Sequence, residues 1–218
     1  MLRPEWFEAK AADREPERWV ELGRHERRGR GHPLDTTVSL MAKPTLFLTV
    51  GLPGCGKTTA ARQFESEHAA LRLTADEWMK ALYGVENPST ARDVVEGRLI
   101  SIALRSLTLG INVALDFGLW SREERSALRY AGDAAGASVA MWYAPIQAEE
   151  QRRRHDVRLA TDPHTTWSIT DEELRVWAES FDVPTPGELT GNEPIEPPPT
   201  GFASWTEWMQ HRWPARVE

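Results

Sequence analysis

The sequence predicts an α/β fold in which helices cover both faces of a mainly parallel sheet. Two short apolar runs, 45–50 and 111–115, have the composition of strands that are buried on both faces. Apolar residues recur at helical spacing elsewhere, for example along 91–109. Because strands alternate with helices, parallel pairing is favoured, and 218 residues suffice for one such domain with additional segments.

The first half of the chain places this alternation around a glycine-rich turn. After the first strand, a helix is predicted over 57–69 and a short strand over 71–73. Thr74 and Glu77 form a T-x-x-E pattern, which predicts a capping box at the start of the next helix. Residues 84–90 contain Gly, Asn and Pro and are predicted to form a loop before the long helix.

The second half continues the same pattern. The second buried strand ends on Asp116, and Ser121 with Glu124 predicts a capping box on a helix that ends near Gly136. Five further segments are predicted in chain order: a strand over 138–143, a basic helix over 146–160, a helix over 171–181 capped by Thr170 and Glu173, an irregular proline-rich stretch over 183–201, and a tail helix over 203–213.

Composition narrows the cellular context. The net charge of -7 argues against a general nucleic-acid binder. Cys55 is the only cysteine, so no disulfide can form within the chain, as is typical of a reducing compartment. No segment has the length of a membrane span, and the charged N-terminus lacks the apolar core of a signal peptide. We therefore expect a cytoplasmic protein, with most of its ten tryptophans packed in the core.

The glycine-rich turn carries the strongest functional signal. Residues 51–58, GLPGCGKT, match the P-loop pattern G-x-x-x-x-G-K-[ST] between a strand and a helix. Lys57 is expected to reach the β and γ oxygens of ATP, and the Thr58 hydroxyl to ligate Mg²⁺. We interpret Cys55 as a small spacer rather than as a thiol activated by the helix N-terminus. The residues expected to bind the nucleotide are Gly51, Pro53, Gly54, Cys55, Gly56, Lys57, Thr58 and Thr59.

Two acids follow neighbouring strands. Ligands of open parallel sheets bind beyond the carboxyl ends of the strands, so Asp76 and Asp116 are expected to face the same crevice as the P-loop. Asp116 follows an apolar strand, which is typical of an acid that organises Mg²⁺, although aspartates also begin loops. Asp76 is expected to accept the proton of an acceptor hydroxyl, although a helix dipole alone favours an acid there.

Two arginines lie one turn apart on the basic helix. Arg154 and Arg158 share one helix face and are candidates to close over the triphosphate and neutralise charge in the transition state. The simpler alternative is a charged face that is exposed to solvent.

These motifs together resemble one family. The predicted-kinase P-loop family called AAA_33, which is similar to phage polynucleotide kinase, chloramphenicol phosphotransferase and the zeta toxins, shows the same order of motifs: GLPGCGKTTAARQF, LTADEWMKALYG, VALDFGLWSREERSAL, GASVAMWYAP and EEQRRRHDVR. The resemblance covers about residues 45–190 and implies a three-layer P-loop NTPase fold with a helical lid, an ATP·Mg²⁺ site and a hydroxyl acceptor. It places Asp76 at the general base, Asp116 at the acid after the third strand, and Arg154 and Arg158 at the lid arginines.

The chain departs from this resemblance at two positions. Polynucleotide kinase carries an arginine shortly after its base, where this chain has Met79 followed by Lys80, and this argues against a polynucleotide acceptor. The family's lid often reads R-x-x-x-R-N, and Leu159 takes the place of the Asn. After the DFGLW turn, Arg122 or Arg125 either holds the substrate or packs the turn.

The resemblance and the composition divide the chain into three predicted parts. A charged N-terminal extension occupies 1–40, the P-loop kinase domain occupies 41–190, and a proline-rich linker with a short helix occupies 191–218. The two outer parts lie outside the resemblance.

The leading interpretation is an ATP-dependent kinase that phosphorylates a hydroxyl group of a small molecule. Phe117, Trp78 and Trp120 adjoin the two acids and are candidates for an apolar wall of the acceptor site, although core packing explains them as well. One alternative is a polynucleotide 5′-hydroxyl kinase, which the basic helix and residues 24–30 favour and the net charge opposes. A second alternative is a nucleotide-binding switch with slow ATP hydrolysis and a protein partner. A toxin role is also compatible with the resemblance, and no membrane partner is expected.

Overall fold

A computed structural model describes residues 43–84, 86–164 and 166–214 of the chain. The described residues belong to one compact unit, Leu40–Glu218. The predicted N-terminal extension over 1–40 therefore lies outside the described residues. No helix in the described part is both long enough and apolar enough to cross a bilayer.

The described part contains one four-stranded sheet, in the order β2-β3-β1-β4. The strands are β1 (Thr45–Val50), β2 (Leu71–Thr74), β3 (Val113–Asp116) and β4 (Ser138–Tyr143). All three pairings are parallel, which confirms the predicted α/β class. The two predicted buried runs are neighbours in the centre of the sheet, as their continuous apolar sequences require.

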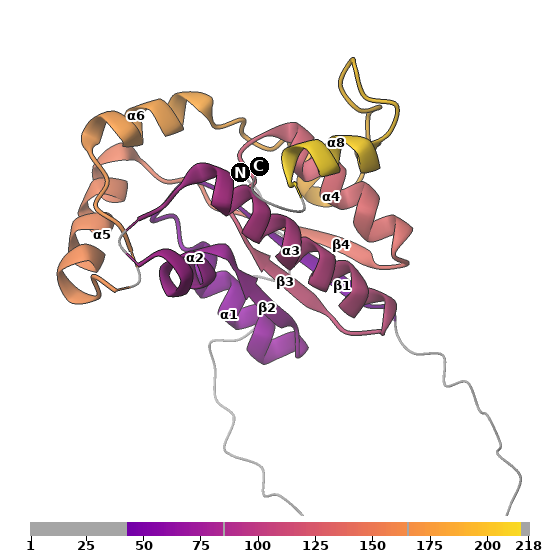
Figure 1. Cartoon of the computed structure of the whole chain (residues 1–218), viewed down its shortest axis with the longest axis horizontal. Coiled ribbons are helices and arrows are strands. Elements are labelled where there is room, and N and C mark those ends of the chain that lie inside the picture. The colour runs from indigo at the N-terminus through magenta and orange to yellow at the C-terminus, as the bar shows by residue number, and fades with distance from the viewer. Residues whose placement is uncertain (1–42, 85, 165, 215–218) are drawn as a thin grey trace, which may run out of the picture. The chain divides into compact units, whose positions relative to one another are not determined.

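Helices cover both faces of this sheet, which makes the fold three-layered (Figure 1). On one face, Phe47 of β1 stacks on Phe64 of α1 (Lys57–His68), with ring centroids 4.5 Å apart. On the other face, the alternate strand residues pack with α3 (Ser89–Thr108) and α4 (Arg122–Ala134). These residues are Leu46, Leu48, Val50, Leu73, Val113 and Leu115.

Three helices stand near the ends of the strands. They are α2 (Ala75–Tyr83), α5 (Ala148–Thr161) and α6 (Asp171–Ser180). The last two form the orange pair at one side of Figure 1 and correspond to the predicted helical lid. Predicted and observed boundaries of these and the other long elements agree within about two residues.

The C-terminal part is more ordered than its proline content predicts. Within the stretch 183–201, which was expected to be irregular, Pro186–Thr190 forms a short helix, α7. Thr185 and Glu188 make a capping box there, and Pro186 occupies the first turn, where its missing N–H costs nothing. Pro186 therefore begins a helix here instead of preventing one.

The tail helix α8 (Trp205–Arg212) packs beside α4 and belongs to the same compact unit as the sheet. Trp205, Trp208 and Trp213 are buried in the core and meet edge to face, with centroids 5.6 and 5.7 Å apart. Trp142 and Trp167 are partly buried against the core, whereas Trp78 is half exposed and Trp120 and Trp177 line a cleft, so the expectation of core packing holds for five of the eight described tryptophans. The packing of α8 brings its last residues next to α3 and α4.

One predicted capping box is wrong. Ser121 and Thr170 cap their helices as expected, each with its Glu partner. Thr74 makes no side-chain bond to α2, because its hydroxyl donates to Asp116 and accepts from Arg72. Glu77 accepts a hydrogen bond from Arg72 as well, so both members of the predicted box bind side chains of the sheet strands instead of capping α2.

Candidate active site

The P-loop connects β1 to α1 through a backbone that only glycine adopts easily. Gly51, Gly54 and Gly56 have φ values of 140°, 81° and 103°. A Cβ on Gly51 would lie 2.7 Å from the Cys55 sulfur, so a side chain there would collide as well as strain the loop. Helix α1 has no side-chain cap and no acid in its first turn, which leaves its first amides available to an anion.

Lys57 holds its ammonium group inside this loop. Its Nζ donates to the carbonyl oxygens of Gly51 and Leu52, both at 2.9 Å. The buried Cys55 sulfur lies 4.0 Å from the same nitrogen and fills the space beside Gly51. Its burial and these contacts fit the interpretation of Cys55 as a spacer.

Asp116 ends β3 directly beside the P-loop helix. Its carboxylate accepts a hydrogen bond from the Thr74 hydroxyl at 3.3 Å and lies 3.5 Å from the Arg72 guanidinium. Burial raises the pKa of Asp116, and the neighbouring Thr58, Lys57 and Arg72 oppose this rise. The Asp116 side chain is only 2% exposed, so Thr74 and Arg72 take the place of water around its carboxylate.

Thr58 and Asp116 form an oxygen-donor pair that fits Mg²⁺. This ion usually keeps several waters and takes one or two protein oxygens together with phosphate oxygens. Among the described residues, no group of three or more His, Cys, Asp and Glu side chains could form a metal cage. The donor set therefore suits a cation that arrives with a nucleotide.

Asp76 lies in the first turn of α2, with 49% of its side chain exposed. The guanidinium of Arg92, in the first turn of α3, donates to its Oδ1 at 2.8 Å. Arg92 also lies over the ring of Trp167 and donates to Asn87. Sequence reasoning missed Arg92, because no spacing links it to Asp76 and only the packing of α3 on α2 brings them together.

The lid helix α5 contacts the P-loop. Arg154 donates to the carbonyl oxygen of Gly54 at 3.1 Å and to Glu150 at 2.5 Å. Arg153 and Arg154 both bond Glu150 and lower its pKa to about 2. Arg158, one turn further along, lines the same cleft.

These groups surround one cleft of about 880 Å³. Its lining includes both predicted acids, both lid arginines and six of the eight predicted nucleotide-binding residues, Pro53, Gly54, Gly56, Lys57, Thr58 and Thr59. Gly51 and the buried Cys55 do not line the cleft. Trp120 and Phe117 of the expected apolar wall are also present, and Trp120 donates to the Gly51 carbonyl at 3.3 Å. Trp78 is absent from the lining and is half exposed elsewhere, so its expected place in this wall is wrong. As the second residue after Asp76, Trp78 points to a different side of α2.

Arg122 and Arg125 hold the C-terminal segment. Arg125 is fully buried and donates to both oxygens of Glu188, at 2.9 and 3.1 Å, and to the Asp182 carbonyl at 2.7 Å. Arg122 pairs with Glu193 and with Glu196. Neither arginine lines the cleft, so these contacts favour packing over substrate binding.

The end of the cleft beyond Asp76 carries a charge cluster that sequence reasoning did not find. Arg212, the last residue of α8, lies 2.7 Å from Glu124 and 3.9 Å from Glu96, and it donates to Asp93 at 2.5 Å. Burial raises the pKa of Glu96 to about 7, while Arg212 and Arg92 oppose this rise. No local signal joins these positions, because they come from three separate helices.

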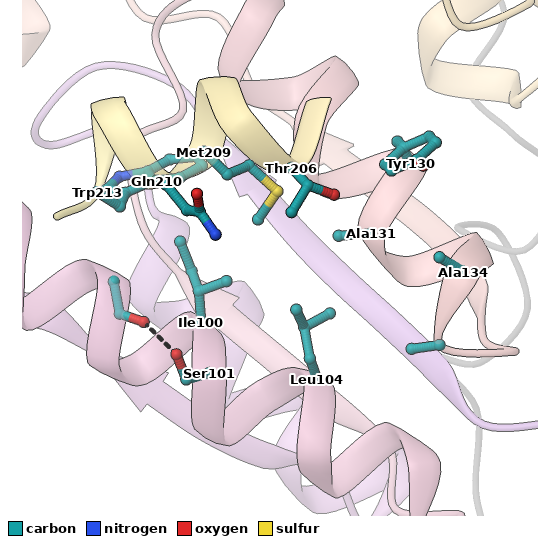
Figure 2. Close-up of a pocket in the computed structure, with 12 residues that line it drawn as sticks. Ile100, Ser101, Leu104, Tyr130, Ala131, Ala134, Thr206, Met209, Gln210 and Trp213 are labelled. Carbon is teal, nitrogen blue, oxygen red and sulfur yellow. Dashed lines mark hydrogen bonds between the residues drawn. The ribbon is translucent and has the colours of Figure 1, made fainter. Parts of the chain in front are cut away.

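A second hollow lies between α3, α4 and α8, with a volume of about 450 Å³ (Figure 2). Ile100, Leu104, Met209 and Trp213 give it an apolar surface. It has no carboxylate, lysine or arginine in its lining. We therefore place the chemistry in the larger cleft.

Comparisons with solved structures support the fold. A component of the Pnkp1/Rnl/Hen1 RNA repair complex aligns with TM-score 0.55 and 19% identity, over 70% of this chain and 47% of that chain. A Chloroflexus aurantiacus protein described as a candidate kinase aligns with TM-score 0.51 and 18% identity, over 73% of this chain and 85% of that chain. Kti12 of Chaetomium thermophilum in complex with ADP-AlF3 aligns with TM-score 0.50 and 18% identity, over 65% of this chain and 82% of that chain. The chain thus spans about half of the length of the repair-complex component, and the likeness concerns the fold alone.

A comparison with curated protein sequences gives no match. The family described as an AAA domain, AAA_33, matches residues 46–184, which is more than half of the 218 residues. The match begins on β1 and ends after α6, so it includes the P-loop, both acids and the lid. The protein therefore belongs to the AAA_33 family of P-loop proteins, as its motifs indicate.

Proposed function

We propose that the protein is a kinase that transfers the γ-phosphoryl group of ATP to a hydroxyl group of a small molecule. The observation that carries this proposal is the single cleft in which the P-loop, Asp76 and the lid arginines meet. A half-exposed carboxylate within the nucleotide cleft is the group that an alcohol acceptor needs, because its proton must leave as the phosphoryl group arrives.

The nucleotide end of the cleft supplies charge. The first amides of α1 and the Lys57 ammonium would bind the β and γ oxygens, in place of the loop carbonyls that Lys57 now contacts. Thr58 and Asp116 would hold Mg²⁺, which neutralises charge on the phosphate oxygens when it is bound. Arg154 and Arg158 would stabilise the negative charge that spreads over the transferred group.

The acceptor end supplies the base. The hydroxyl oxygen bonds to the γ phosphorus, the bond from that phosphorus to the bridging oxygen breaks, and ADP leaves with the electron pair. Asp76 takes the hydroxyl proton, and Arg92 fixes the carboxylate through the 2.8 Å bond to one oxygen, which leaves the other oxygen for the alcohol.

The experiment that tests this function pairs two variants with a labelled nucleotide. Lys57→Ala should abolish transfer from radiolabelled ATP to a mixture of hydroxyl compounds and weaken Mg·ATP binding in calorimetry. Asp76→Asn should bind Mg·ATP as the native protein does but transfer about 10²- to 10⁴-fold more slowly, as expected for loss of a general base. Native transfer rates in Asp76→Asn would refute the base assignment.

A polynucleotide 5′-hydroxyl kinase is the second candidate, supported by the fold likeness to a component of an RNA repair complex. It requires a cationic path for phosphates, and binding that weakens steeply as salt rises. Labelled transfer to an oligonucleotide with a free 5′-hydroxyl, measured beside the small-molecule mixture, separates the two.

A nucleotide-dependent switch is the third candidate, since Kti12 with ADP-AlF3 shares the fold. It predicts a complex with a protein partner that depends on ATP, and slow hydrolysis without any phosphorylated alcohol.

A further inference from the structure

The end of the cleft beyond Asp76 is built by helices that meet only in the folded chain. Asp76 comes from α2, Arg92 and Glu96 from α3, Glu124 from α4 and Arg212 from α8. Asp76, Arg92, Glu96 and Glu124 lie within the residues that match the family, whereas Arg212 of α8 lies outside them, so the C-terminal segment adds one residue to this wall.

Both guanidinium groups of this wall are already paired. Arg92 lies 2.8 Å from Asp76 and 3.8 Å from Glu96. Arg212 contacts Glu124 at 2.7 Å and Glu96 at 3.9 Å, and its third partner, Asp93, lies behind the wall. An anionic acceptor would have to displace one of these carboxylates or lie beside it, which is unfavourable in a partly buried site.

The carboxylates outnumber the guanidiniums at this end. Three carboxylates and two guanidiniums line it, and Asp93 adds a further negative charge. Glu96 is partly protonated near neutral pH, because burial and the nearby Glu124 raise its pKa to about 7 in spite of both arginines. The raised pKa of Glu96 means that an additional negative charge is unfavourable at this wall. The wall therefore favours ligands with hydroxyl or ammonium donors over anions.

One further group points to an oxygen-bearing ligand. Trp167 lines the cleft, and its indole Nε1 is buried without a hydrogen-bond partner among the described residues. A buried N–H without an acceptor costs free energy, and a hydroxyl oxygen would satisfy it. Trp120 and Trp177, whose ring centroids lie 5.5 Å apart, add aromatic surface on which the apolar face of a polyol can pack.

We propose that the acceptor is an uncharged or cationic alcohol, and that Glu96 and Glu124, held in place by Arg212 of α8, accept hydrogen bonds from its hydroxyl or ammonium groups. The inference rests on the proposed kinase function and narrows its substrate class. It also assigns to α8 a part in selecting the acceptor.

The test uses the full chain, radiolabelled ATP and three acceptor pools at pH 7. The first pool holds amino sugars and amino alcohols. The second holds neutral sugars and nucleosides, and the third holds sugar acids, sugar phosphates and an oligonucleotide with a free 5′-hydroxyl. We expect labelled product from the first or second pool, whereas product from the third pool alone would overturn the inference.

Two controls separate this inference from the kinase proposal. Calorimetry with Mg·ATP is measured on the same preparation. Product from the third pool alone refutes the acceptor class and leaves the kinase function intact, while no product in any pool, with or without Mg·ATP binding, refutes the proposed function itself.

Glu96→Gln tests the wall directly. With the best acceptor of the active pool at pH 8, above the pKa of Glu96, this variant should raise KM about tenfold or more, with kcat and the Kd for Mg·ATP nearly unchanged, because a charged hydrogen bond to the acceptor is lost. Glu179→Gln, on the exposed face of α6, is the matched control and should leave KM unchanged. Circular dichroism and thermal unfolding of both variants confirm that they fold. An unchanged KM in a folded Glu96→Gln variant would overturn the role of Glu96.

Discussion

Arg92 is the residue through which the fold positions the proposed base. Its guanidinium bonds one oxygen of Asp76 and lies over the ring of Trp167, so it fixes a half-exposed side chain that would otherwise choose among rotamers. The same guanidinium is 3.8 Å from Glu96, which links the base to the acceptor wall.

We expect Arg92→Ala to lower kcat about 10- to 100-fold while the Kd for Mg·ATP stays within a few-fold of the native value. The reason is that Asp76 keeps its chemistry but loses its orientation. Arg92→Lys should restore part of kcat, since an ammonium still reaches a carboxylate but forms one bond instead of a planar fork. Steady-state kinetics of both variants check this, with Arg175→Ala on exposed α6 as control. Equal kcat in Arg92→Ala and the native chain would contradict a positioning role.

At the residue level, the sequence singled out the P-loop and Asp116, which the structure places along one cleft, but not the charged residues at the far end of that cleft, the proposed acceptor wall (Arg92, Glu96, Glu124 and Arg212). The P-loop residues are contiguous, and Asp116 follows a recognisable buried strand, so local patterns suffice for them. Arg92, Glu96 and Arg212 are ordinary charged residues on helices, and their sequence contains nothing that distinguishes them from a solvated face. Arg212 comes close to the two α3 residues only when α8 packs against the domain, and this packing is tertiary structure that local patterns do not predict.

At the scale of elements, the ion pair between Arg125 of α4 and Glu188 of α7 joins the C-terminal segment to the domain. Both side chains are buried, with 0% and 1% of their surfaces exposed. Glu188 also accepts from the Thr185 backbone, so the pair fixes both the start of α7 and the turn that follows Trp120. The pKa of Glu188 is lowered, because hydrogen bonds from Arg125 and Thr185 outweigh its burial.

We expect Arg125→Ala to destabilise the protein by about 3–5 kcal/mol, because it leaves the Glu188 carboxylate buried without its partner. The double variant Arg125→Met/Glu188→Leu should recover much of this loss, since no uncompensated charge remains. Urea unfolding followed by circular dichroism measures both changes. A double variant as unstable as the single one would show that the hydrogen bonds to Asp182 and the turn, rather than the ion pair, stabilise this junction.

The capping patterns show how far local sequence alone predicts the start of a helix. Ser121 and Thr170 are free to cap, and both predicted boxes are present. Thr74 has the same pattern, but Asp116 of the neighbouring strand takes its hydroxyl, so a long-range contact overrides the local one. The box at Thr185 was missed because the surrounding prolines suggested irregular chain, although proline is well suited to a first helical turn.

At the scale of the whole molecule, α8 couples the core to the cleft. Its tryptophans fill the core between α3 and α4, while Arg212 at its end reaches the acceptor wall. The Trp213 indole donates to Glu96 at 3.0 Å, so the packing of the tail and the charge of the wall depend on one another. The sequence predicted the helix but placed it outside the predicted P-loop kinase domain of residues 41–190, because no periodicity reveals which surface a tail helix covers.

This coupling predicts that stability depends on pH through Glu96. Its pKa is near 4.5 in the unfolded chain and about 7 in the folded protein, because burial disfavours its charged form more than Arg212, Arg92 and the Trp213 hydrogen bond favour it, and Glu124 adds repulsion. The folded state therefore binds more protons between these two values, so the free energy of unfolding falls as pH rises through that window. The decline is about 1 kcal/mol per pH unit for this one group, added to the slopes of all other groups.

Urea unfolding at pH 5, 6, 7 and 8 tests this coupling in the native chain and in Glu96→Gln. The variant cannot ionise at this position, so the difference in unfolding free energy between the two chains should grow in favour of the variant as pH rises from 5 to 7 and level off above that range. Glu179→Gln, whose side chain is mostly exposed, should follow the native curve. Parallel curves for the native chain and Glu96→Gln would mean that the arginines of the wall compensate the buried charge fully, and that the tail helix tolerates an ionised Glu96 at no cost to the fold.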